Sequence, residues 1–262
     1  MPKINRMSVY TTEITSDQIP SDNPIHQRLL KAYHVAAPLV SGDLLELGCG
    51  EGRGIELLLP KVKSYLGLDK IEAVISSLKI KFPKAQFESG VFPPINLPDN
   101  SFDTLVSFQV IEHIQNDDQF LSEIHRILKP GGKAILSTPN IKMTLSRNPW
   151  HTREYTADEL ERLASKYFSK VEMKGIAGSE NVLAYHEQNR ASVRKVMKYD
   201  VLNLQYRLPA ALLRVPYDFL NRRNRNKLQS QDDELVLSIS QKDYFLAEKS
   251  EQNLDLFCIL SK

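Results

Sequence analysis

The stretch that most constrains this chain is an apolar run that ends in a glycine-rich loop, LLELGCGEGRG at residues 44–54. Such a run is typical of a buried strand, and the alternate glycines indicate a sharp turn directly after it. Because glycine has no Cβ, the loop can adopt a positive φ and let a ligand approach the bare main chain. The amides that open the following helix would then face that ligand. The stretch therefore predicts a strand that leads into a ligand-binding loop.

The spacing of the glycines distinguishes between two kinds of cofactor. A dinucleotide-binding fingerprint needs glycine at its first, third and sixth positions, but the sixth position counted from Gly48 is Arg53. In addition, Glu46 places a carboxylate just before the loop, where it would repel a phosphate but could bind the ammonium group of an amino acid. A pyrophosphate ligand is therefore the weaker interpretation.

The composition is that of an ordinary soluble protein. The chain has 262 residues, 42% of them hydrophobic and 25% charged, which is enough for one large or two small domains. The net charge of +2 is too small to indicate a polyanionic partner. Cys49 and Cys258 lie far apart in sequence, so we expect no disulfide framework and no zinc site. With no signal region and no apolar run of about 18 residues, a cytoplasmic location is expected.

Hydrophobic periodicity predicts strands that alternate with helices. A β-α-β-α order indicates a parallel sheet with right-handed crossovers. A helix with a capping box formed by Thr156 and Glu159 is expected after the fifth strand. The expected strands are 44–47, 64–68, a short one from Phe87, 104–108, 134–136, one near Val171, and 254–260. The first expected helix ends near 41–42, and the second covers 55–59. Three further helices are expected from apolar faces within 71–78, 120–128 and 160–167.

Four separate pieces of the sequence occur in a fixed order: the loop 46–54, Asp69 at the end of the second strand, the segment 97–103 followed by Ile111-Glu112-His113, and LKPGG at 128–132. With these pieces in this order, residues 44–140 resemble the class I S-adenosylmethionine-dependent methyltransferases. The resemblance implies an α/β, doubly wound, mostly parallel seven-stranded Rossmann-like sheet with an antiparallel last strand. It also implies S-adenosylmethionine as cofactor and S-adenosylhomocysteine as product.

The resemblance also assigns cofactor contacts to the strand ends. The loop glycines would contact the methionine part, and Asp69 would accept from both ribose hydroxyls, which its two carboxylate oxygens suit. By itself, Asp69 could equally be a turn residue. Many relatives have an acidic residue after the third strand, whereas here the main chain, Val91 or Phe92 would hold the adenine. The expected cofactor-binding residues are Glu46, Gly48, Cys49, Gly50, Gly52, Asp69, Lys70, Val91, Phe92 and Gln109.

Two histidines are the candidate catalytic residues. His113 follows the fourth strand and His151 lies in a polar, aromatic loop after the fifth, and the cleft of such a sheet opens at the carboxyl ends of its strands. Each could be a general base or a structural residue. The segment 111–113 also resembles quinone-biosynthesis O-methyltransferases, some of which have a further acidic residue that helps to bind a divalent cation. Gln109 occupies that position, so no metal is expected.

Residues 179–253 separate the last two expected strands and are too long for a hairpin loop of about two to five residues. Between 187 and 230 they contain ten basic and three acidic residues. The apolar segment 208–220 precedes a basic cluster at 222–227, and contact with a lipid surface through 208–227 would suit that order. The alternatives are a lid over an apolar acceptor and a helical cap with solvated arginines. Nucleic acid is not expected, because stacking aromatics are not interleaved with the basic residues.

These observations predict three parts. Residues 1–42 would form an N-terminal arm and helix, 43–178 with 254–262 would form the cofactor-binding Rossmann-like domain, and 179–253 would form an inserted helical cap or lid. The leading functional hypothesis is methyl transfer to a small-molecule acceptor, with oxygen as the expected atom. The alternatives are a nucleotide-dependent oxidoreductase and a catalytically inactive binding module of the same fold. Neither the acceptor nor the oligomeric state can be read from the sequence.

Overall fold

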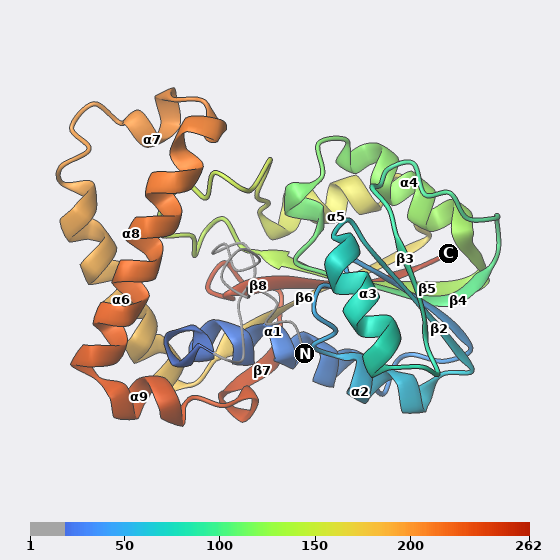
Figure 1. Cartoon of the computed structure of the whole chain (residues 1–262). Coiled ribbons are helices and arrows are strands. Elements are labelled where there is room, and N and C mark those ends of the chain that lie inside the picture. Colours follow the sequence, from blue (N-terminus) through green and yellow to red (C-terminus); the bar gives the residue numbers. More distant parts are fainter. Residues whose placement is uncertain (1–18) are drawn as a thin grey trace. The chain divides into compact units, whose positions relative to one another are not determined.

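The computed structural model describes residues 19–262, and its central feature is a sheet with the strand order β3-β2-β1-β4-β5-β8-β6-β7 (Figure 1). The expected arm therefore falls largely outside the described residues. The strands are β1 Asp43–Leu47, β2 Ser64–Asp69, β3 Gln86–Ser89, β4 Phe102–Phe108, β5 Leu128–Pro139, β6 Lys170–Gly178, β7 Tyr244–Glu248 and β8 Asp255–Ser261.

The pairing of the strands confirms the predicted fold class. β1 lies between β2 and β4 in parallel pairing, and β3 and β5 extend the parallel part on either side. The last strand, β8, pairs antiparallel with both β5 and β6. The described sheet has eight strands where seven were expected. The additional strand is β7, which lies inside the long segment that was interpreted as wholly inserted.

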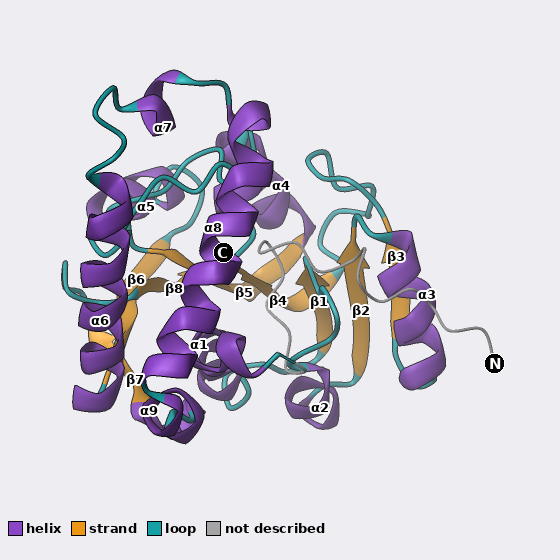
Figure 2. Cartoon of the chain, turned by 60° about the vertical axis from the view of Figure 1, so that its left-hand side comes forward, coloured by secondary structure: helices purple, strands orange, loops and turns teal. Residues whose placement is uncertain are grey.

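Helices connect these strands, and Figure 2 shows them in purple against the orange strands. Thr156 begins α5 with the predicted capping box, in which its hydroxyl accepts from the Glu159 amide and the Glu159 carboxylate accepts from the Thr156 amide. The helices are α1 Asn23–Ala36, α2 Ile55–Leu58, α3 Glu72–Lys81, α4 Asp117–Ile127, α5 Ala157–Ala164, α6 Glu180–Met197, α7 Leu204–Arg207, α8 Ala210–Gln231 and α9 Asp233–Ser238. No helix among the described residues combines the length and apolarity needed to cross a bilayer.

The segment LKPGG ends α4 as predicted, but it is part of strand β5. Leu128 pairs with Phe102, and the next pair joins Lys133 to Thr104, so the register shifts across the two glycines. Gly131 has a φ of +78°, which glycine adopts without the penalty of a Cβ. The turn is therefore present as an irregularity within the strand.

The described residues form two compact units. The helical unit comprises the segment that ends at Arg28, together with Thr144–His151 and Gly178–Phe245. The sheet unit comprises Leu29–Met143, Thr152–Ala177 and Leu246–Lys262. These boundaries group residues 144–151 and part of α1 with the inserted helices, which the expected domain limits did not. The role of the inserted helices as a lid stays a prediction.

Buried polar contacts hold the helical unit together. Asp22 is fully buried, and its carboxylate accepts from Arg222 at 2.6 Å and from Arg225 at 2.9 Å. The side-chain amide of Asn23 donates to the carbonyls of Val236 and Ile239, each at 2.8 Å. The beginning of α1 is therefore fastened to α8 and to the end of α9.

Candidate functional site

The glycine loop follows β1 and is bonded to the end of β2. The amides of Gly48 and Cys49 donate to the Leu68 carbonyl at 2.8 and 3.1 Å. The amide of Gly50 donates to the Asp69 carboxylate at 2.9 Å. Because these bonds join the carboxyl ends of two neighbouring parallel strands, they place the loop where α/β sheets bind ligands.

Gly50 differs from the other two loop glycines in what surrounds it. A Cβ at Gly48 would lie 2.3 Å from the Val110 side chain, and one at Gly52 would lie 2.6 Å from Leu78. A Cβ at Gly50 would have no heavy atom of residues 19–262 within 4 Å, and the φ of Gly50 is +48°. The packing of the protein therefore requires glycine at positions 48 and 52, whereas Gly50 borders open space that a ligand can occupy.

Asp69 is only 8% exposed and already accepts two main-chain hydrogen bonds. One carboxylate oxygen accepts from Gly50, and the other accepts from the amide of Ile71 at 3.0 Å. Each carboxylate oxygen has a second lone pair that a ribose hydroxyl can use. Asp69 thus fixes the loop against β2, and its contact with the ribose stays a prediction.

Glu46 lies at the centre of a buried cluster that sequence reasoning missed. Its carboxylate is 1% exposed and accepts from the hydroxyls of Tyr33 at 2.7 Å and Tyr65 at 2.5 Å. Burial raises the pKa of Glu46 to about 7, although both tyrosine hydrogen bonds act to lower it. In the sequence Tyr33 is only an apolar position of α1, so its spacing gives no sign of this contact. The expected ammonium contact of Glu46 stays a prediction.

The side chain of Cys49 points into the sheet. It is 2% exposed, and its sulfur lies 3.1 Å from where a Cβ of Gly67 would be. Burial raises the pKa of the Cys49 thiol far above its usual range. In this position only the main chain of Cys49 is able to contact a cofactor.

The remaining expected cofactor contacts surround the same strand ends. Val91 is 82% exposed, whereas Phe92 stacks on Phe120 with ring centroids 5.8 Å apart. Gln109 has a φ of +58°, and its main-chain amide donates to the Ser137 main-chain carbonyl at 2.8 Å. Lys70 is exposed. Val91 is thus the freer of the two apolar candidates, because Phe92 already packs against the core.

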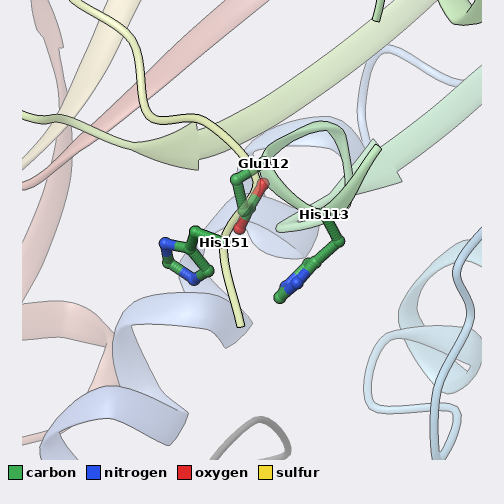
Figure 3. A group of neighbouring side chains, drawn as sticks. All are labelled: Glu112, His113 and His151. Carbon is green, nitrogen blue, oxygen red and sulfur yellow. The ribbon is translucent and has the colours of Figure 1, made fainter. Parts of the chain in front are cut away.

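Glu112 and His113 form a short turn after β4, and the loop after β5 is bonded to them. The amide of Thr152 donates to the Glu112 carbonyl at 2.7 Å, and its hydroxyl donates to the His113 carbonyl at 3.3 Å. His151 precedes Thr152, so the peptide bond keeps it beside this turn. One ligand atom from each of Glu112, His113 and His151 lies within 4.8 Å of the others (Figure 3).

These three side chains have the chemistry of either proton transfer or metal binding. The Glu112 carboxylate is buried and accepts from the Thr138 hydroxyl at 2.9 Å, while the His151 ring lies 2.8 Å from the amide nitrogen of Asn148. Imidazole and carboxylate are common ligands of divalent cations. The expectation of no metal was based on Gln109, which does not belong to this group. It stays a prediction, as do the catalytic roles of both histidines.

Comparisons with known proteins agree with this arrangement. The family described as Methyltransferase domain matches residues 45–136. A probable S-adenosylmethionine-dependent methyltransferase of Mycolicibacterium smegmatis is 39% identical over 160 residues, which cover 58% of this chain and 62% of that protein. The chain therefore spans less than two thirds of the length of this relative. A mitochondrial ubiquinone biosynthesis O-methyltransferase of Dictyostelium discoideum is 28% identical over 53% of this chain and 47% of its own length.

The fold is also found among solved structures. An S-adenosylmethionine-dependent methyltransferase of Thermotoga maritima aligns over 91% of both chains with a TM-score of 0.58 and 15% identity. That identity supports the fold alone. Residues 45–136 therefore match a methyltransferase domain, the related sequence from Mycolicibacterium smegmatis has the name of an S-adenosylmethionine-dependent methyltransferase, and the cofactor that this similarity implies is S-adenosylmethionine.

Proposed function

We propose that this chain transfers the methyl group of S-adenosylmethionine to a small-molecule acceptor, with oxygen as the methylated atom. The open space beside Gly50, next to the buried Asp69 carboxylate, is the observation that supports the proposal most directly. A cofactor in that space would meet bare main chain on one side and a carboxylate with free lone pairs on the other. When bound, the cofactor supplies a methyl group on a positively charged sulfur.

The glycine loop offers a sharp test of cofactor binding. In Gly50→Ala the added methyl group would enter the open space, so we expect affinity for S-adenosylhomocysteine to fall at least about tenfold, or about 1.4 kcal/mol. Gly131→Ala is the matched control, because Gly131 also has a positive φ and open space around its Cβ position. Gly131 lies near the amino end of β5, whereas the glycine loop follows the carboxyl end of β1. Both variants carry the same left-handed strain of about 1–2 kcal/mol. Isothermal titration showing equal affinity in both variants would contradict this placement of the cofactor.

Asp69 provides a second test of the same site. We expect Asp69→Ala to remain folded and to lose measurable binding, since each charged hydrogen bond contributes about 1.5–3 kcal/mol. Thermal-shift measurements with S-adenosylmethionine, S-adenosylhomocysteine and NAD should show stabilisation of the wild type by the first two only. Stabilisation by NAD alone would favour an oxidoreductase, and unchanged S-adenosylhomocysteine affinity in Asp69→Ala would remove the ribose assignment.

We further infer that His113 or His151 removes the proton of a hydroxyl acceptor. The proton would move from the acceptor oxygen to an imidazole nitrogen while that oxygen takes the methyl group. A positioned general base typically contributes about a hundredfold to ten-thousandfold. His113→Ala or His151→Ala should therefore lower turnover by about two decades with cofactor affinity unchanged. His125 lies in α4 and packs on Phe168, and His125→Ala is the control variant.

Full turnover in the double variant of His113 and His151 would show that the base lies elsewhere. Tyr155 is a poor replacement, because it is fully buried and its hydroxyl donates to Asp117 at 2.7 Å. Burial, with the Asp117 carboxylate as a further cause, also raises the pKa of Tyr155 well above its usual range.

A further inference from the structure

The helical unit exposes a concentration of large apolar side chains. Of the eighteen large apolar side chains that are exposed among the described residues, ten lie in residues 196–220, which we call the apolar end. This stretch runs from the last residues of α6 through α7 into α8, as Figure 1 shows. Tyr199 is 88% exposed and Val201 is 81% exposed. Large exposed apolar surfaces on proteins mark sites of interaction with other proteins or with membranes.

On α8 the exposed side chains form a regular stripe. Leu212, Val215 and Phe219 recur at helical spacing and are 65%, 78% and 66% exposed. The residues of α8 that are buried, Arg225 and Leu228, lie on the opposite face of the helix. In sequence such a stripe indicates a face that packs against a core. Among the described residues, nothing covers this stripe, so it can contact something else.

Basic side chains accompany the apolar end. Five exposed basic residues occur between 194 and 217, and the one acidic residue of that stretch is Asp200. The Asp200 carboxylate accepts from the amides of Leu204 and Gln205, so it caps α7. The exposed basic residues are Arg194, Lys195, Lys198, Arg207 and Arg214.

The structure changes the position expected for a lipid contact. In the sequence, one interpretation of residues 208–227 was a lipid contact, because the apolar segment precedes the basic cluster 222–227. Arg222 and Arg225, however, pair with the buried Asp22, and Arg225 is only 7% exposed. Those two arginines therefore stabilise the helical unit itself, which leaves Arg223 and Lys227 as the exposed basic residues of that cluster. Five further exposed basic residues lie earlier in the chain.

We propose that the apolar end binds the surface of an anionic lipid bilayer, with the α8 stripe among the acyl chains and the basic residues at the phosphate groups. This combination of apolar and basic side chains is what interfacial helices present to anionic lipid. A second copy of the chain in a two-fold interface would instead bring the same basic surface against itself. Nucleic acid would satisfy the charges but would leave the valine and leucine side chains without stacking partners.

Vesicle flotation of the full chain tests this proposal. The probe is phosphatidylcholine vesicles with about one third phosphatidylglycerol, compared with phosphatidylcholine alone. We expect binding to the anionic vesicles, weakened by high salt. Replacing the stripe by serine in Leu212→Ser, Val215→Ser and Phe219→Ser should reduce the bound fraction on the order of tenfold. Ile80→Ser is the matched control, since Ile80 is 84% exposed on α3 of the sheet unit and should have no effect.

Trp150 checks that the variants keep their fold. It is the chain's single tryptophan, its indole N–H donates to Asp218 of α8 at 3.0 Å, and Arg214 lies 4.4 Å from its ring centroid. Its emission should be the same in the stripe variant and in the wild type without vesicles. No flotation of the wild type, or equal flotation of the stripe variant, would overturn the proposal. If sedimentation shows a dimer of the wild type that the stripe variant does not form, the stripe contacts a second copy of the chain and not a bilayer.

Discussion

Each of the two units contains a buried carboxyl group, and the two groups are held in opposite ways. In the helical unit the carboxylate of Asp22 contacts two guanidinium groups, which hold its pKa below the usual value of 3.8 although burial acts to raise it. In the sheet unit the carboxyl of Glu46 contacts two tyrosine hydroxyls, and burial raises its pKa to about 7.

Burial acts to raise the pKa of both carboxyl groups, and the difference lies in how strongly the partners oppose it. A guanidinium offsets the cost of desolvating the carboxylate with its own charge, whereas a neutral hydroxyl contributes only a hydrogen bond. Asp22 therefore stays ionised near neutral pH and holds α8 through its ion pairs with Arg222 and Arg225. Glu46, beside the glycine loop, can gain or lose a proton near neutral pH.

The largest effect should follow removal of the Asp22 charge. Asp22→Asn leaves Arg225 buried without its ionic partner, which we expect to cost about 3–5 kcal/mol of unfolding free energy. The stabilisation that Asp22 contributes is present above its unfolded pKa and is lost as the pH falls through the lower pKa of the folded state. Urea unfolding followed by Trp150 emission measures both effects.

Asp118→Asn is the control for that experiment, because Asp118 pairs with Lys166 but its side chain is 47% exposed. Its loss should cost no more than about 1 kcal/mol. Equal costs for the two variants would show that the Asp22 pair contributes no more than a surface pair.

A smaller effect, of opposite pH dependence, should follow replacement of Glu46. Because the pKa of Glu46 is raised from 4.5 to about 7, its stabilising contribution is fully present below pH 4.5 and is lost as the pH rises through 7. Over that interval the unfolding free energy of the wild type should fall by about 3 kcal/mol more than that of Glu46→Gln. Parallel pH profiles for the two proteins would mean that Glu46 is ionised throughout.

The smallest effect concerns a single hydroxyl. Tyr65→Phe removes a hydrogen bond that lowers the pKa of Glu46, so we expect that pKa to rise further and stability at pH 8 to fall by about 1–2 kcal/mol. Tyr244→Phe in the helical unit also removes one hydrogen bond, from the tyrosine hydroxyl to the Pro24 carbonyl at 2.7 Å. That loss should be the same at pH 5 and pH 8. A pH-independent loss in Tyr65→Phe would contradict the role given to its hydroxyl.

The sequence by itself determined the parts of this protein that depend on near neighbours. The glycine loop after β1, Asp69 at the end of β2, and the capping box of Thr156 and Glu159 were all located correctly. Each depends on a backbone conformation or a spacing of a few residues. The antiparallel last strand followed from the family resemblance and is confirmed.

Only the tertiary structure decided contacts between residues that are distant in sequence. Asp22 and Arg222 lie 200 positions apart, and nothing in either neighbourhood indicates the other. The same arginine therefore suggested a surface cluster in the sequence and proved to be part of an internal ion pair. The stripe on α8 has the spacing of a core face, yet it is exposed. Periodicity shows that a helix has an apolar face, whereas only the positions of its neighbours determine whether that face is covered.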